Sequence, residues 1–210
     1  ASSVDFNFNS IETDIKTAVS YSDLFISKIN SDLTYSSTIT TGGIDSSITV
    51  QNFKIDLSNN LYVSGSFYGT VDFNPFTEVD NKTNSGGDDG FLLKINSDSS
   101  YAFTKTISTS GSDSVQGICI RNGNIFITGY TGGQIKDFIV KKYDNTGLET
   151  FTKTIATANA EYGNDIVVNK YNDLYVTGVF NGVVDFNPET AVDEKTSSNN
   201  TGDIFIWKWY

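Results

Sequence analysis

Two copies of the phrase VDFNP carry the side chains in this sequence that are most similar to ligands for a hard cation. Carboxylate and amide oxygens suit calcium, but the ligand spacing of an EF-hand loop is absent. Asn-Pro favours an extended or turn geometry, in which an Asp side chain accepts hydrogen bonds from nearby backbone N–H groups. We therefore expect these side chains to be structural and predict no metal site. The oxygens in question belong to Asp72 and Asn74 in the first copy and Asp185 and Asn187 in the second, which Asp80 or Asp193 could join.

A second possible chemistry rests on Asp113 and Glu161, which occupy matching positions before a repeated β-branched segment. A pair of carboxyl groups can support glycoside hydrolysis or lyase chemistry without histidine. The competing interpretation is that each side chain caps a turn, and the sequence favours it. No acid stands in an apolar context that would raise its pKa, so no catalytic residue is predicted.

The residue types that are missing exclude more chemistry than those present suggest. The chain has no His, the usual general base and the commonest zinc ligand. Cys119 is the only cysteine and stands between two isoleucines, which indicates a buried strand thiol and excludes an intrachain disulfide. Arg121 is the only arginine. We predict that the protein is not an enzyme and uses no cofactor.

Composition predicts one globular unit with an acidic surface. The 210 residues are 38% hydrophobic, and 14 Lys and Arg stand against 25 Asp and Glu, for a net charge of -11. No basic stripe is present, so nucleic acid is not an expected partner. No apolar run approaches the roughly 18 residues of a membrane span, and no signal peptide is recognisable. Because the chain lacks Met, we expect a processed chain or a piece of a larger one.

Repeats explain how the chain is organised. One element is an apolar strand with an aromatic residue three positions before a lysine, written four times. The aligned aromatic residues are Phe25, Phe91, Phe138 and Phe205, and the lysines are Lys28, Lys94, Lys141 and Lys208. A strand rich in Thr and aromatic residues follows the first three copies, as YSSTI or FTKTI. A hairpin comes next, whose second run ends in Ser-Gly or Thr-Gly.

Each repeat therefore contains four short strands, and the intervals between the aligned aromatic residues are 66, 47 and 67 residues. The two long intervals contain VDFNP. Four-stranded units of this size are typical of β-propeller blades. We predict an all-β, propeller-like array of four-stranded antiparallel blades in a single repeat domain, residues 1–210. Its parts are a partial blade 1–41, a blade 42–109, a blade 110–157 and a partial blade 158–210.

The order DxFxxK, aromatic-Thr strand, Gly/Ser/Asp turn, IxV and NxxYVTG is similar to the SBBP repeats of secreted β-propeller proteins. VDFNP resembles a phrase found between strands in surface-protein versions of those repeats. The resemblance covers the chain from Val4 to Lys208. It implies that the IxV strand is first from the centre, LYVTG second, DxFxxK third and FTKTI outermost. It also implies an exported or surface protein, but no particular activity.

Blades that are incomplete at both ends predict assembly. An unfinished C-terminal blade leaves the edge of DIFIWKWY without a partner strand, which another chain can cover. The N-terminal segment contains the complementary outer strand YSSTI. We expect head-to-tail contact between copies, or between adjacent segments of a longer chain, giving a ring or a filament. The candidate interface residues are Phe205, Trp207, Trp209, Tyr210 and Tyr35.

Two Asn-x-Thr sequons, at Asn81 and Asn199, lie in the loops that follow VDFNP. In an exported eukaryotic protein both would be candidates for N-glycosylation. The predicted function is a non-enzymatic structural or interaction module of an extracellular or cell-surface assembly. The first alternative is a glycan-binding lectin that stacks sugars on Trp207 or Trp209. The second is a carboxylate-dependent glycosidase or lyase.

Overall fold

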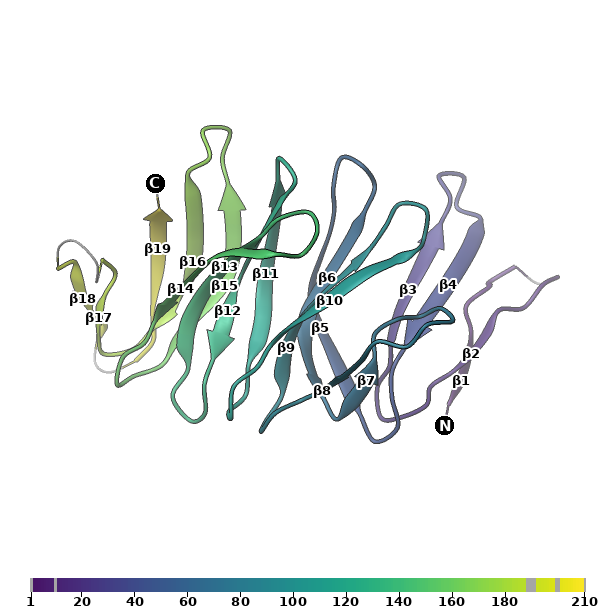
Figure 1. The fold of residues 1–210 in the computed structure, drawn as a ribbon, viewed down its shortest axis with the longest axis horizontal. Coiled ribbons are helices and arrows are strands. Elements are labelled where there is room, and N and C mark those ends of the chain that lie inside the picture. The colour runs from purple at the N-terminus through teal and green to yellow at the C-terminus, as the bar shows by residue number, and fades with distance from the viewer. Residues whose placement is uncertain (1, 10, 188–191, 199–200, 210) are drawn as a thin grey trace.

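The computed structural model describes residues 2–9, 11–187, 192–198 and 201–209. Over these residues the protein consists of β-strands, turns and loops, and no α-helix is present among them (Figure 1). The all-β prediction is confirmed. The strands form several small antiparallel sheets.

The strand bounds follow the chain in order. They are β1 Ser3–Asp5, β2 Ile15–Thr17, β3 Leu24–Ile29, β4 Tyr35–Thr41, β5 Ser47–Ile55, β6 Leu61–Tyr68, β7 Thr70–Asp72, β8 Asn81–Thr83, β9 Asp89–Ile95, β10 Tyr101–Ile107, β11 Ser114–Arg121, β12 Asn124–Thr131, β13 Asp137–Tyr143, β14 Glu149–Ile155, β15 Glu161–Val168, β16 Leu174–Phe180, β17 Val183–Asp185, β18 Glu194–Thr196 and β19 Asp203–Trp209.

Four sheets follow one another along the chain. The first sheet is the pair β3-β4, the second sheet has the order β5-β6-β9-β10, the third sheet β11-β12-β13-β14 and the fourth sheet β15-β16-β19. Three two-stranded hairpins, β1-β2, β7-β8 and β17-β18, are separate from these sheets. Each contains one copy of the Val-Asp-Phe-Asn phrase, and we call them the first, second and third DF hairpins.

The sheets stand side by side in a curved row, and the two chain ends lie at opposite ends of it (Figure 1). Strand β11 contacts both β5 of the sheet before it and β15 of the sheet after it. The second, third and fourth sheets therefore approach one another along their first strands. Each internal sheet is covered on both faces, which explains why the strands are apolar at consecutive positions.

The core consists of three apolar clusters, one in each gap between neighbouring sheets. The gap between the first and second sheets holds Leu24, Phe67, Val71, Phe73, Phe91 and Leu93 among others. The gap between the second and third sheets holds Leu92, Val115, Ile118, Ile125, Ile127 and Ile139. The gap between the third and fourth sheets holds Phe138, Val140, Val176, Val184, Phe205 and Trp207.

The Ser-Gly and Thr-Gly pairs, which lie inside the second strands and not at their ends as the sequence suggested, have a steric role. A Cβ atom at Gly65, Gly129 or Gly178 would lie 1.8 to 1.9 Å from a backbone carbonyl oxygen of the first strand in the same sheet. A β-bulge interrupts the first strand beside each of these glycines. Only glycine lets the bulged backbone approach so closely.

Strand pairing corrects one alignment that the sequence suggested. The glycines Gly65, Gly129 and Gly178 pair with Phe91, Ile139 and Phe205. Ile139, and not Phe138, therefore occupies the position of Phe91 and Phe205. Because side chains alternate across a strand, Phe138 points to the opposite face. In the third sheet, Ile139 is therefore the equivalent of the aligned phenylalanines, and Lys142, three residues later, is the equivalent of the aligned lysines.

Candidate assembly interface

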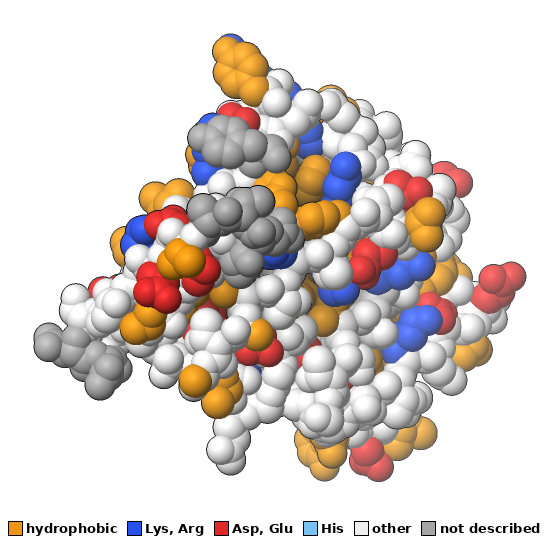
Figure 2. All heavy atoms as spheres, turned by 60° about the vertical axis from the view of Figure 1, so that its left-hand side comes forward, with side chains coloured by type: hydrophobic (Ala, Val, Ile, Leu, Met, Phe, Trp, Pro, Cys, Tyr) orange, Lys and Arg blue, Asp and Glu red, His pale blue; other side chains and the backbone are white. Residues whose placement is uncertain are grey.

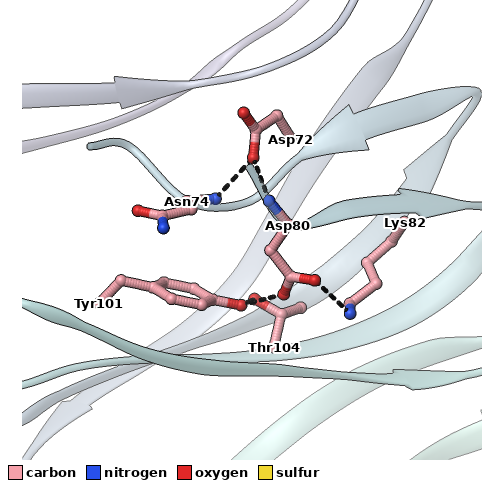
Figure 3. Close-up of polar contacts among 6 residues, drawn as sticks. All are labelled: Asp72, Asn74, Asp80, Lys82, Tyr101 and Thr104. Carbon is pink, nitrogen blue, oxygen red and sulfur yellow. Dashed lines mark hydrogen bonds and ion pairs between the residues drawn. The ribbon is translucent and has the colours of Figure 1, made fainter. Parts of the chain in front are cut away.

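The first aspartate of each DF hairpin holds the hairpin loop by the same two hydrogen bonds. Asp72 Oδ1 accepts from the backbone N–H of Asn74 at 3.0 Å and of Asp80 at 2.9 Å (Figure 3). Asp5 accepts equivalent bonds in the first DF hairpin and Asp185 in the third. Backbone donation to the ionised form, from Asp193 and Asn187, holds the pKa of Asp185 below its usual value.

A second aspartate attaches two of the hairpins to the outermost strand of a sheet. The hydroxyl of Tyr101, at the start of β10, donates to Asp80, which is also ion-paired with Lys82 at 2.6 Å (Figure 3). Tyr35, at the start of β4, donates in the same way to Asp14 of the first DF hairpin. The third sheet has no DF hairpin before its outer strands, and the matching residue there is Glu149. The tyrosine therefore accompanies the hairpin.

The third DF hairpin has the aspartate and the lysine of this arrangement, since Lys195 is ion-paired with Asp193. The fourth sheet has three strands among the described residues, with β19 at its edge. It therefore has no counterpart of β10 in the described part of the chain. Of the aspartate, lysine and tyrosine found together at the other two hairpins, the third DF hairpin therefore has the aspartate and the lysine.

Aromatic stacking fixes each hairpin to one strand of its sheet, which is β3, β9 or β19. The ring centroids of Phe73 and Phe91 are 5.0 Å apart with an interplanar angle of 41°. The pair Phe6 and Phe25 gives 4.9 Å and 42°, and the pair Phe186 and Phe205 gives 5.0 Å and 46°. Three copies of one geometry show that VDFN encodes a structural clamp.

These contacts leave little of the carboxylates for a cation. Asp72 Oδ1 already accepts two backbone N–H groups, and Asp80 already bonds Lys82 and Tyr101. Within the described ranges no three or more Cys, Asp or Glu side chains are grouped so that they could hold a metal ion. The geometry supports the structural interpretation of the phrase.

The aromatic residues proposed for the interface lie mostly in the interior. Phe205 and Trp207 pack against Phe138 in the gap between the third and fourth sheets, and Trp207 Nε1 donates to the carbonyl of Phe186 at 3.0 Å. Trp209 is half-buried against Phe151. Tyr35 is half-buried at Asp14. Tyr210 lies outside the described residues.

The opposite face of the fourth sheet is uncovered and exposes apolar side chains beside polar ones such as Asp165 and Thr177. Ile204 and Ile206 of β19 are 82% and 74% exposed, and Val167 of β15 is 56% exposed. By strand pairing, the first two match Phe138 and Val140 of the third sheet, both completely buried. We call Val167, Ile204 and Ile206 the C-terminal face. Figure 2, which turns the C-terminal end forward, shows hydrophobic side chains at the surface among acidic and basic ones.

At the other end of the row, apolar side chains are also exposed where their counterparts inside the row are buried. Val4 of the first DF hairpin is 52% exposed, whereas Val71 and Val184 at the same hairpin position are completely buried. Phe25 is 56% exposed, whereas its counterpart Phe91 is completely buried. We call Val4, Phe6 and Phe25 the N-terminal face. Nothing in the local sequence marks these residues as different from their counterparts, because the difference lies in which sheet stands next to them.

The two acids considered for catalysis lie in different gaps between sheets. Asp113 accepts from the backbone N–H of Thr109 at 2.7 Å and of Gly132 at 3.0 Å, so it caps turns. Glu161 accepts from the Thr157 hydroxyl at 2.6 Å, while its Oε2 is buried without a partner. Burial, with a smaller contribution from the Asp137 charge, raises the pKa of Glu161 to about 7. The expectation that no acid has a raised pKa is therefore wrong for Glu161, because its burial arises from tertiary packing.

A groove of about 480 Å³ opens between the third and fourth sheets. Its lining combines aromatic and polar groups, including Trp209, Phe126, Phe151, Arg121 and Asn172. The Nε atom of Arg121 is buried without a hydrogen-bond partner. Aromatic faces beside an unsatisfied donor are suited to a sugar.

Of the two predicted glycosylation sites, Asn81 lies in β8 with an exposed side chain. Asn199 lies outside the described residues. In the described part of the chain, no helix has the length and apolar character that a membrane span requires. No protein-family model matches the sequence, and no curated protein matches it.

Proposed function

We propose that this protein is a non-enzymatic structural module of an extracellular or cell-surface assembly, built from propeller-type blades like those of the SBBP repeats. The second and third sheets support the blade interpretation, because each has four strands in the order that the resemblance to SBBP repeats implies. The curved row of sheets, closest at their first strands, also agrees with it.

One observation carries the proposal of self-association. Both ends of the row expose apolar side chains whose counterparts inside the row are buried, such as Ile206 against Val140 and Val4 against Val71. Apolar side chains grouped at an uncovered sheet face are suited to contact with another protein surface. A further sheet would cover such an end, and a second copy of the module or an adjacent segment of a longer chain would supply one.

The polar side chains support a structural role in the same way. The aspartates of the DF hairpins hold loops, lysines and tyrosines, and Asp113 holds two turns. The exposed sequon at Asn81 supports the extracellular setting, because a glycan there would extend into solvent.

The experiment for this proposal is sedimentation of the full chain over a wide concentration range, together with a hydrolysis screen on a broad glycan panel. We expect concentration-dependent assembly and no turnover. Turnover that is lost in Glu161→Gln would instead favour the glycosidase alternative. A chain that remains a monomer of 23.0 kDa at every concentration would refute the proposed self-association.

Sugar binding is a second candidate function, which the groove beside Trp209 favours. A glycan array probed with the full chain tests it. Trp209→Ala should abolish saturable binding, while Trp209→Phe should retain part of it because the phenyl ring still offers a stacking face. Absence of binding by the unmodified chain would exclude this candidate.

A further inference from the structure

We infer that the C-terminal face of one copy packs on the N-terminal face of a second copy and forms a third example of a junction that the chain already contains twice. The inference rests on the proposed self-association and specifies which surfaces meet. Its basis is the comparison of equivalent positions in the repeats.

The first example of this junction lies between the first and second sheets. Leu24 and Ile26 of β3 belong to the same apolar cluster as Phe91 of β9. The second DF hairpin completes the cluster with Val71 and Phe73. Two aliphatic residues of β3 therefore meet a phenylalanine of β9 and the valine and phenylalanine of the second DF hairpin.

The second example lies between the third and fourth sheets. Phe138 and Val140 of β13 share a cluster with Phe205 of β19, and the rings of Phe138 and Phe205 are 5.3 Å apart. The third DF hairpin contributes Val184 and Phe186. The five positions are the same as in the first example.

The two end faces supply the same five positions on separate surfaces. Ile204 and Ile206 match Phe138 and Val140, and they stand uncovered. Phe25 matches Phe205, and Val4 and Phe6 match the hairpin residues of both internal junctions. Each face is one half of a junction, so a second copy provides the missing half of both.

The geometry makes this contact heterologous. The two faces lie at opposite ends of the row, so one copy cannot close the junction on itself (Figure 1). Every copy has one face of each kind, and assembly continues until it closes as a ring or extends as a helical filament.

Two variants test the pairing. Ile206→Asp places a charge in the C-terminal face, and Val4→Asp places one in the N-terminal face. Each variant alone should weaken association by about 100-fold or more, because either substitution disables every contact between identical copies. An equimolar mixture should form a dimer and nothing larger, since one intact face of each kind remains. Leu57→Asp, at a fully exposed turn residue, is the matched control and should assemble like the unmodified chain.

Circular dichroism and the melting temperature check that each variant is folded. Val4→Thr keeps the shape and strand preference of valine and serves if Val4→Asp unfolds the hairpin; it should weaken association by a smaller factor. Assembly by one variant alone would overturn the inference, because it would show that the intact face pairs with itself. Assembly unaffected by both variants would overturn it while leaving the proposed function standing. Failure of the unmodified chain to assemble would refute both.

Discussion

At the scale of single residues, the Glu161 carboxyl group is the clearest case of a side chain whose behaviour its surroundings decide. The side chain is completely buried and one oxygen has no partner, so burial disfavours the ionised form. Its pKa of about 7 lies above the ordinary value of 4.5. The folded protein therefore retains a proton that the unfolded chain releases.

This shift predicts how stability depends on pH. The contribution of Glu161 is fully present below pH 4.5 and is lost as pH rises to about 7. The free energy of unfolding should fall over this range, by roughly 1 to 3 kcal/mol for this group. Glu161→Gln should remove that part of the slope in chemical denaturation at a series of pH values. Glu12→Gln, at an exposed acid, is the control, and an identical slope in both variants would contradict the assignment.

The hydroxyl of Tyr101 gives a second prediction. Tyr101→Phe removes the donor to Asp80 and leaves the ring in place. We expect a loss of about 1 to 3 kcal/mol in the free energy of unfolding, because a charge-assisted hydrogen bond to a partly buried carboxylate is broken. Urea denaturation measures it. Tyr171→Phe, at a largely exposed tyrosine, should change stability by less than about 0.5 kcal/mol. Equal effects would show that the hydroxyl does not hold the hairpin.

Residue types alone were enough to predict that Asp72 and Asp185 are structural, because short polar side chains before Asn-Pro bond their own loop. The sequence could not place Phe205 and Trp207, since alternation along β19 leaves open which face meets a neighbouring sheet. It also could not show that Ile204 and Ile206 are uncovered.

At the scale of elements, strand content followed from β-branched runs and turn residues, and the resemblance to SBBP repeats implied the strand order seen in the second and third sheets. The register of β13 could not be predicted from the repeats. The spacing of Phe138 before Lys141 matches the other repeats, yet pairing with Gly129 shows that Ile139 is the equivalent residue. A one-residue shift exchanges the two faces of a strand, and a doubled lysine makes both alignments fit the sequence.

The bulge beside the second strand predicts a steep steric penalty at Gly129. An Ala Cβ would lie 1.9 Å from the carbonyl oxygen of Ser114, so the backbone would have to move. Gly129→Ala should lower the free energy of unfolding by about 3 kcal/mol or more, measured by urea denaturation. Gly133→Ala, where a Cβ meets nothing within 4 Å, should have little effect. A tolerated Gly129→Ala would mean that the bulge is not sterically required.

At the scale of the whole molecule, the DF hairpins and the end faces use the same set of apolar positions. The second and third DF hairpins each fill the junction between their own sheet and the sheet that precedes it along the chain. No described sheet precedes the first DF hairpin. In the proposed assembly, its exposed valine and the exposed isoleucines of β19 form the two halves of such a junction. Because each copy has a net charge of -11, the apolar contact forms against mutual repulsion, and added salt should strengthen association by screening it.

Cryo-electron microscopy of the assembled, unmodified protein tests the central claim most directly. The account predicts a single type of contact, repeated between all neighbours, in which Val4 and Phe25 of one copy lie against Ile204 and Ile206 of the next. The stacked sheets should continue across this contact as they do inside the chain. A two-fold contact between identical faces, or an assembly in which Ile204 and Ile206 remain open to solvent, would contradict it.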